Sequence, residues 1–152
     1  AELERAGKLS AVITQNIDGL HQKAGSRCVL ELHGSVYRNA CQHCGKRYTL
    51  EQVMQAHGVP RCACGGIVKP EVVLYGEPLD ESVLRQSVEA IRSADLMIVG
   101  GTSLAVYPAA GLVDYYFGDR LVLINREETP LDRRATLVFH DPIGQVLGQI
   151  QG

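Results

Sequence analysis

Short strand-forming runs, each followed by polar residues, constrain the fold of this 152-residue chain more than any other feature. They lie at residues 11–14, 28–32, 71–75, 96–99, 121–124 and 137–139. The later runs alternate with helical patterns: Asp80 is a predicted N-cap, and Leu84, Val88 and Ile91 follow on one helical face. Short apolar strands that alternate with helices are typical of a doubly wound parallel sheet. We therefore predict an α/β fold, with further helices at residues 108–116 and 143–150.

Polar side chains follow three of these predicted strands directly. They are Gln15, Asn16 and Asp18 after the first strand, Thr102 and Ser103 after the fourth, and Asn125 after the fifth. In open parallel sheets, ligands bind outside the carboxyl ends of the strands. The sequence therefore predicts that these residues line one ligand crevice.

Each of these signals has an ordinary structural explanation when it is taken alone. The turn at Gly100–Ser103 can cradle phosphate, but many strand-to-helix turns are rich in glycine, and the full G-x-G-x-x-G pattern is absent. Asn125 fits an ordinary turn, and Asp18 fits the N-cap of a short helix. His33 fits a half-buried histidine with satisfied hydrogen bonds. The other four histidines are expected to be structural or exposed.

Four of the five cysteines form two close pairs. Cys41 and Cys44 are separated by two residues, and Cys62 and Cys64, after seventeen intervening residues, by one. Two such pairs supply four thiolates for a tetrahedral zinc ion, and a site with four sulfur ligands leaves no open position for catalysis. A redox motif needs one pair only, and free buried cysteines do not suit a polar segment. We predict a structural zinc site and place Cys28 in the core or in a strand.

The cysteines belong to a polar segment that differs in composition from the rest of the chain. We predict a zinc-binding module at residues 37–69, inserted into an α/β domain formed by residues 1–36 and 70–152. Thr49 with Gln52 three residues later predicts the start of one short module helix, which ends near Gly58.

Charge and cysteine usage limit the partners and the compartment. The net charge is −2, and no apolar run approaches the length of a membrane-spanning helix. Although the module carries several cations, the chain has no aromatic stacking platform, so we expect neither nucleic acid nor membrane as a partner. Clustered thiols predict a reducing compartment, the cytoplasm. Residues 1–9 predict the last turns of a helix, so we expect the chain to begin in mid-fold.

Six motifs occur in the same order along the chain as in the sirtuins, a family of NAD-dependent protein-lysine deacylases. The chain resembles a bacterial-type member of this family. The motifs are TQNIDGLH at residues 14–21, LHGS at 32–35, the two cysteine pairs, KPEVVLYGE at 69–77, GTSL at 101–104 and Ile124 with Asn125. The resemblance implies a Rossmann-like NAD-binding domain with an inserted zinc ribbon. The N-terminal part of the family, which carries a glycine-rich phosphate loop, has no counterpart in these residues.

The resemblance assigns the cofactor-binding residues. Gln15, Asn16, Ile17 and Asp18 would surround the nicotinamide and its ribose, where an amide bonds ribose hydroxyls and Asp18 accepts from the carboxamide. Gly101, Thr102, Ser103 and Asn125 would hold the adenosine half of NAD.

The resemblance also assigns the catalytic base and the substrate site. His33 would take a proton from a ribose hydroxyl, and the products would be free lysine, nicotinamide and O-acyl-ADP-ribose. An acylated-lysine peptide would add as a strand along residues 71–75, with contacts from Val72, Val73, Leu74, Gly76 and Glu77.

Two other functions remain open at this point. One is an inactive, zinc-binding sirtuin remnant, and the other is mono-ADP-ribosyl transfer, which uses the same cleavage of NAD. The oligomeric state, the acyl preference and the protein targets are not predicted.

Overall fold

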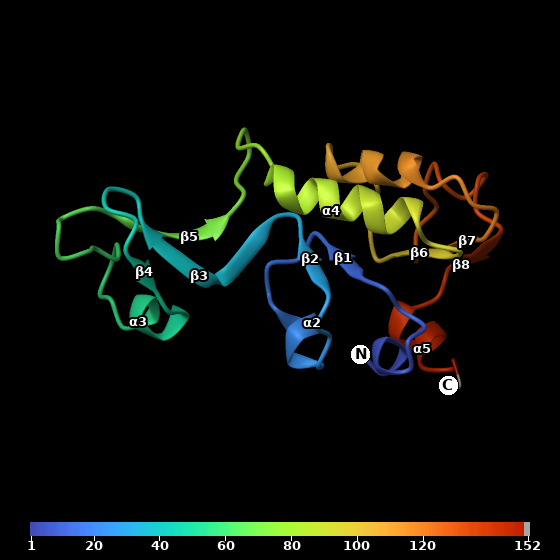
Figure 1. Cartoon of the computed structure of the whole chain (residues 1–152), viewed down its shortest axis with the longest axis horizontal. Coiled ribbons are helices and arrows are strands. Elements are labelled where there is room, and N and C mark those ends of the chain that lie inside the picture. The colour runs from blue at the N-terminus through green and yellow to red at the C-terminus, as the bar shows by residue number, and fades with distance from the viewer. Residues whose placement is uncertain (151–152) are drawn as a thin grey trace. The chain divides into compact units, whose positions relative to one another are not determined.

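The predicted parallel strands form two sheets in the computed structural model, which describes residues 1–150 (Figure 1). The chain divides into two units: unit 1 comprises Ala1 and Val12–Leu84, and unit 2 comprises Glu2–Ala11 and Arg85–Gly152. In unit 1, β1 (Val12–Thr14) pairs in parallel with β2 (Val29–Glu31), and the short helix α2 (Leu20–Lys23) connects them. The parallel α/β class is thereby confirmed.

The cysteine module is built on an antiparallel sheet within unit 1. Its strand order is β4-β3-β5, and the strands are β3 (Gly34–Cys41), β4 (Arg47–Tyr48) and β5 (Val68–Val72). The register shifts between Ser35 and Asn39, where the Asn39 side chain donates to the Val36 carbonyl at 2.9 Å. Strands β3 and β4 were not predicted, because their composition is polar and their strand partners lie elsewhere in the chain.

The module helix α3 (Leu50–Met54) begins as predicted. The Thr49 hydroxyl accepts from the Gln52 N–H at 3.3 Å, and the Gln52 side chain accepts from the Thr49 N–H at 2.9 Å. This capping box satisfies two backbone donors that the first turn leaves without helical partners. The helix is shorter than predicted, because its C-cap is Gln55 rather than a residue next to Gly58.

Unit 2 contains a three-stranded parallel sheet in the order β6-β7-β8. The strands are β6 (Met97–Gly100), β7 (Leu121–Ile124) and β8 (Leu137–Phe139). The central strand β7 forms the core, since Leu123 and Ile124 are among the largest fully buried side chains. A central strand that is apolar on both faces is expected for a parallel sheet.

Several helices differ from the prediction in type or length. The helix expected at 108–116 is the 3-10 helix η1 (Ala109–Tyr115), and the closing helix is shortened to α5 (Ile143–Leu147). The predicted N-terminal helix is α1 (Glu2–Arg5), and α4 (Glu81–Arg92) begins where Asp80 accepts from the backbone N–H groups of Ser82 and Val83. No helix in the described part is long and apolar enough to cross a membrane.

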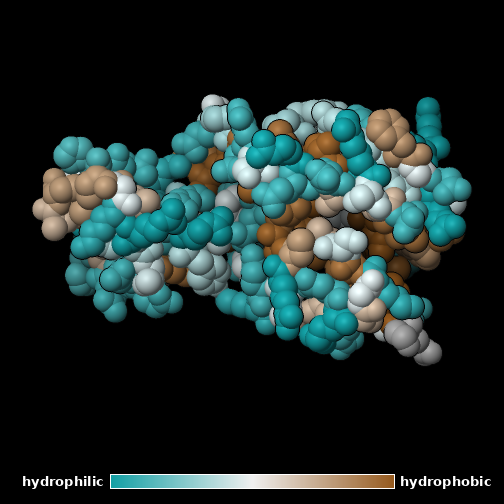
Figure 2. All heavy atoms as spheres, in the orientation of Figure 1, coloured by the Kyte–Doolittle hydropathy of each residue, from teal (hydrophilic) through white to brown (hydrophobic). Residues whose placement is uncertain are grey.

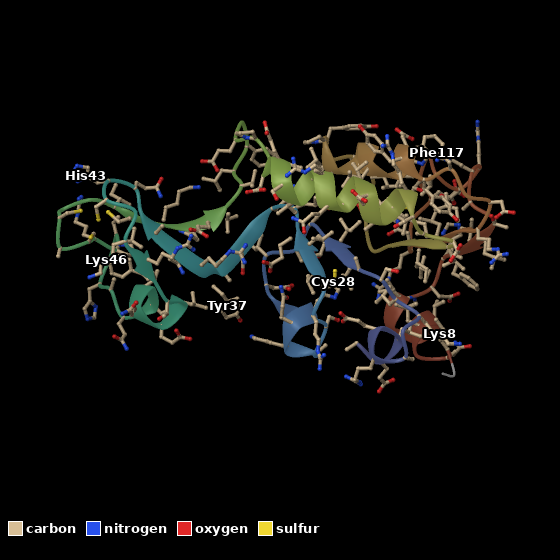
Figure 3. The ribbon with its side chains drawn as sticks, viewed as in Figure 1. Lys8, Cys28, Tyr37, His43, Lys46 and Phe117 are labelled. Carbon is tan, nitrogen blue, oxygen red and sulfur yellow. The ribbon has the colours of Figure 1, made fainter. Side chains whose placement is uncertain are left out.

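Two further predictions need correction. The strand expected at residues 71–75 ends at Val72, because a tight turn begins at Leu74, whose carbonyl accepts from the Glu77 N–H at 3.0 Å. Cys28 is exposed just before β2 rather than buried in the core (Figure 3).

Candidate functional site

His33 lies in the turn between β2 and β3, where a backbone contact fixes its ring. The ring Nδ1 lies 3.0 Å from the carbonyl oxygen of Gln15. Because a carbonyl oxygen only accepts, Nδ1 must carry the proton in this hydrogen bond. The other ring nitrogen, Nε2, is then the basic one in the neutral ring. This arrangement suits a general base.

The loop after β1 lies against the same turn. Its backbone is held by the Val36 N–H, which donates to the Ile17 carbonyl at 3.1 Å. The Asp18 carboxylate accepts from the Leu20 N–H at 3.0 Å at the start of α2. The N-cap of α2 is Gly19, so Asp18 lies one residue before the predicted capping position. The loop is anchored to β3 by the Val36 N–H and to the first turn of α2 by the Asp18 carboxylate.

Tyr37 of β3 supports this loop from the side (Figure 3). A Cβ atom added to Gly19, whose φ is +65°, would meet the Tyr37 ring at 2.8 Å, so a larger residue there would have to displace the ring. The Lys23 ammonium lies 5.1 Å from the centre of the same ring. The sequence gives no signal for this packing, since Tyr37 belongs to a strand that was not predicted.

The predicted substrate segment continues from β5 beside His33. Val72 pairs with Gly34, and the Val73 N–H donates to the His33 carbonyl at 3.0 Å. The next two side chains, Leu74 and Tyr75, are exposed. Unit 1 therefore brings together the predicted base, the loop after β1 and the predicted substrate segment.

The four predicted metal ligands come together in the module. The sulfur atoms of Cys41, Cys44, Cys62 and Cys64 all lie within 4.8 Å of one another, and Figure 3 shows the sulfur atoms grouped near His43. Two separations are 3.5 Å and 3.6 Å. A tetrahedral zinc ion with Zn–S bonds of about 2.3 Å requires S–S separations of about 3.8 Å. The spacing therefore fits the ion, including the tight second pair.

Backbone groups close around the sulfur atoms. The His43 N–H donates to the Cys41 sulfur at 3.4 Å. A Cβ atom on Gly66 would lie 2.7 Å from that sulfur, so only glycine allows this close approach. The ligand loops are thus shaped by the chain itself.

The surroundings of Cys62 and Cys64 shift the pKa values of their thiols in opposite directions. Hydrogen bonds from the Cys64 backbone N–H and from the Tyr48 side chain lower the pKa of Cys62 to about 6. The Gly66 N–H lowers the pKa of Cys64, but the neighbouring thiols outweigh it and raise that pKa to about 12. Four thiolates at this spacing therefore need a compensating cation.

The remaining predicted cofactor residues lie in unit 2. Gly101 follows β6, and the Thr102 hydroxyl accepts from the Leu104 N–H at 3.2 Å. The Asn125 side chain donates to the Glu127 carbonyl at 2.8 Å, as an ordinary turn asparagine does. The His140 ring lies 2.8 Å from the Asn125 carbonyl, which agrees with its predicted structural role. The sequence predicts that the cofactor residues of unit 1 and those of unit 2 line a single crevice, and this stays a prediction.

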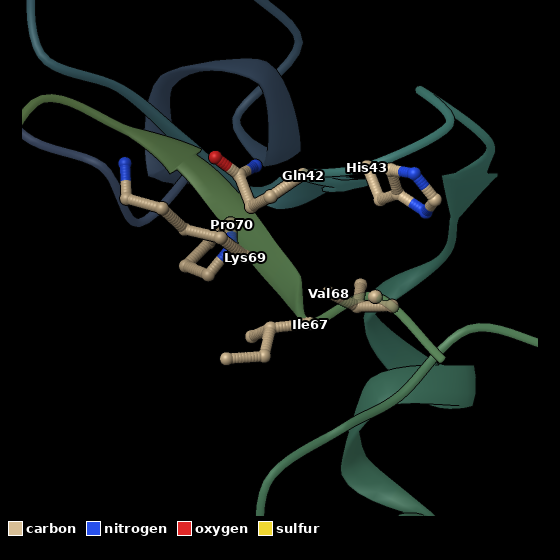
Figure 4. Close-up of a pocket in the computed structure, with 7 residues that line it drawn as sticks. Gln42, His43, Ile67, Val68, Lys69 and Pro70 are labelled. Atoms are coloured by element: carbon tan, nitrogen blue, oxygen red, sulfur yellow. The ribbon is translucent and has the colours of Figure 1, made fainter. Parts of the chain in front are cut away.

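An open cavity of about 590 Å³ lies on the module (Figure 4). It is lined by Gln42, His43, Gly66, Ile67, Val68, Lys69 and Pro70. None of these was predicted to bind NAD, peptide or metal. The cavity therefore does not mark the predicted chemistry.

Charged residues that the sequence analysis did not assign connect the module strands. The buried Glu31 carboxylate accepts from Arg38 at 2.6 Å, and Glu71 lies 3.4 Å from both Arg38 and Arg47. Lys69 reaches Glu77 at 3.1 Å. The pairing of β3 with β4 and β5 brings Arg38 and Arg47 to Glu71, whereas the turn after β5 brings Glu77 back to Lys69.

The fold and the site together define a parallel α/β protein with an inserted four-cysteine module and a histidine in the turn after a strand. The Sir2 family model matches residues 1–108, and the chain belongs to the Sir2 family, the sirtuins. It is 59% identical over 152 residues to an NAD-dependent protein deacetylase of Clostridium perfringens. It is 60% identical over 151 residues to one of Cutibacterium acnes. The matches cover 99% of this chain and 62% of each relative.

Solved structures give the same assignment. A Sir2 structure with a p53 peptide and NAD+ has a TM-score of 0.91 and 42% identity, covering 98% of this chain and 65% of that one. A Sir2 structure bound to acetylated peptide has a TM-score of 0.90 and 42% identity over the same shares. The Rossmann-like α/β class is thereby confirmed.

Proposed function

We propose that the protein containing this chain is an NAD-dependent protein-lysine deacylase that releases nicotinamide and O-acyl-ADP-ribose. The observation that carries the proposal is the His33 ring, whose Nδ1 donates to the Gln15 carbonyl and leaves Nε2 as a base. Membership of the Sir2 family supports the proposal. So do the relatives named NAD-dependent protein deacetylase.

NAD would supply the bond that breaks between nicotinamide and ribose. In unit 1, we assign Gln15, Asn16, Ile17 and Asp18 to the nicotinamide half. In unit 2, we assign Gly101, Thr102, Ser103 and Asn125 to the adenosine half. Amide and carboxylate side chains can hydrogen-bond the ribose hydroxyls and the carboxamide. Hydroxyl side chains can donate hydrogen bonds to phosphate. His33 would accept a proton from a ribose hydroxyl at Nε2.

The substrate we propose is a protein or peptide with an acylated lysine. Val72, Val73, Leu74, Gly76 and Glu77 would contact it, with the exposed Leu74 side chain at the open end of the segment. An apolar wall suits a neutral acyl-lysine and disfavours a charged ammonium. Solved Sir2 structures with acetylated and propionylated peptides support this substrate class.

We assign zinc to Cys41, Cys44, Cys62 and Cys64, where four sulfur atoms would close the coordination shell and make the ion structural. The inserted module would comprise residues 37–69, and the α/β domain residues 1–36 and 70–152. Because clustered cysteines that bind a metal must stay reduced, we propose a reducing compartment, the cytoplasm.

The substitution His33→Ala tests the proposal in the full natural protein. We expect it to lower deacylation of an acetyl-lysine peptide at least about 100-fold, because a general base supplies that factor or more. NAD affinity, measured by titration calorimetry, should stay within about twofold. His57→Ala, at an exposed histidine of the module, is the matched control and should keep full activity.

Mass spectrometry of the products separates the alternatives. ADP-ribose on the released acyl group supports deacylation, whereas ADP-ribose on protein supports ADP-ribosyl transfer. A zinc-loaded protein that binds no NAD at millimolar concentration would be the inactive remnant. Full deacylation by the His33→Ala variant would remove His33 from its proposed role.

A further inference from the structure

The segment that follows β5 is cross-linked to itself by one lysine and one glutamate. The Lys69 ammonium donates to the Val72 carbonyl at 3.0 Å and to the Glu77 carboxylate at 3.1 Å. The same carboxylate oxygen accepts from the Leu74 N–H at 2.9 Å. We call these three hydrogen bonds the Lys69–Glu77 clamp. It holds backbone groups on both sides of Val73.

Val73 connects the clamp to the predicted base. Its N–H donates to the His33 carbonyl at 3.0 Å, directly beside the pairing of Gly34 with Val72. The hydrogen bonds of the clamp reach the Val72 carbonyl and the Leu74 N–H, on either side of Val73. Its effect on His33 therefore passes through the backbone of Val73.

Lys69 is half-buried, whereas Glu77 is exposed. The Lys69 and Glu77 side chains are 28% and 44% exposed, and Lys69 extends along β5 away from Ile67 and Val68 (Figure 4). The Leu74 N–H and then Lys69 hold the pKa of the Glu77 carboxyl below its usual value. The carboxylate is thus ionised at neutral pH, and the clamp includes two charge-assisted hydrogen bonds to it.

The clamp also changes which backbone groups a peptide can use. Backbone groups alternate between the two edges of a strand, and the Val73 N–H faces β3. The Val72 carbonyl thus faces the open edge of β5, and the clamp binds both this carbonyl and the Leu74 N–H in the turn that follows. A peptide that paired with the Leu74 N–H would have to displace Glu77.

We infer that Lys69 and Glu77 are positioning residues of the proposed deacylase, which fix Val73 and, through its hydrogen bond to the His33 carbonyl, the place of the base. The inference rests on the proposed function. Neither residue is assigned to the chemical step. Their role is to keep the segment beside His33 in one conformation before the substrate binds.

The test compares Lys69→Met, Glu77→Ala, the double variant and Lys69→Arg in the full natural protein. We expect Lys69→Met and Glu77→Ala each to lower kcat for deacylation about tenfold, because small misplacements of a catalytic group have effects of this size or larger. The KM for NAD should stay within about twofold. Since both residues serve one clamp, the double variant should lose no more than about twofold beyond Lys69→Met.

Two controls separate positioning from general destabilisation. Lys69→Arg retains the charge and the donors, and should keep kcat within about threefold of the unaltered protein. Lys8→Met changes an exposed lysine of unit 2 and should have no effect (Figure 3). All variants are compared at a temperature at which circular dichroism shows them folded. If the loss of kcat in the double variant equals the product of the two single losses, the inference is overturned. An unchanged kcat in both single variants would also overturn it.

Amide hydrogen exchange tests the clamp independently of activity. In Glu77→Ala, the Leu74 amide loses its acceptor, so we expect it to exchange about tenfold faster or more, and the Val73 amide to accelerate with it. Unchanged exchange at Val73 would overturn the link to His33 even if activity falls. If the unaltered protein deacylates nothing, the proposed function fails, and the exchange data still decide whether the clamp holds Val73.

Discussion

At the scale of single residues, the site depends on positions where a larger side chain does not fit. Gly34 follows His33 directly, has a φ of +76°, and a Cβ atom there would lie 1.9 Å from the Glu71 carbonyl oxygen. The close pairing of β3 with β5 therefore requires glycine at this position. The same pairing places Val73 within hydrogen-bond distance of the His33 carbonyl.

We expect Gly34→Ala to destabilise the protein by about 2 kcal/mol or more, because the two strands must separate. Gly58→Ala is the control, since Gly58 has a φ of +85° but nothing within 4 Å of an added Cβ atom. Gly58→Ala should lower the free energy of unfolding by about 1–2 kcal/mol through backbone strain alone. Urea unfolding of both variants measures the difference, and equal losses would contradict the packing argument.

At the scale of elements, the module depends on its cysteines for both ligands and core. Cys41 and Cys62 are buried with Val68, and Tyr48 and Val53 pack against them. The surface visible over β3 and β5 is mostly hydrophilic (Figure 2). A small element of this kind needs a metal ion for stability.

Removal of zinc by a chelator should therefore loosen residues 41–66 first. Without the ion, thiolates repel one another or must take up protons. Hydrogen exchange followed by mass spectrometry should show faster exchange in β4 and the cysteine loops, while β6, β7 and β8 keep their protection. Added zinc should reverse the change. Uniform or unchanged exchange after verified zinc removal would contradict the prediction.

At the scale of the whole molecule, each unit carries a carboxylate that stabilises its fold in a pH-dependent way. In unit 2, the Thr129 backbone N–H and hydroxyl hold the pKa of Asp132 below its usual value, and His140 lies 3.3 Å away. In unit 1, the Leu74 backbone N–H and then the Lys69 ammonium lower the pKa of the Glu77 carboxyl. A carboxylate with a lowered pKa stabilises the fold above its unfolded pKa of about 4.

The stability contribution of these groups is lost as the pH falls through their folded pKa values. We therefore expect Asp132→Asn to lower the urea midpoint at pH 7 and to reduce the further loss of stability between pH 5 and pH 3. Because zinc loss on acidification is common to both proteins, the difference between them reports on Asp132. An identical pH dependence in both proteins would contradict this role.

The sequence by itself determined the class of fold and the identity of most candidate residues. Apolar runs such as 121–124 predict buried parallel strands because burial on both faces requires such runs. The two cysteine pairs predict a metal site because ligand spacing is local, and the Thr49 capping box follows from two residues three apart. These features depend on neighbours along the chain.

Only the tertiary structure decided what connects the candidate residues. The hydrogen bond that sets the His33 tautomer, the ion pairs of Arg38 and the Lys69–Glu77 clamp join residues whose approach depends on β-pairing or on the turn after β5. Strand β3 was missed because its partners lie in other segments and its own composition is polar. Pairing between distant segments is a property of the folded chain, and no local pattern encodes it.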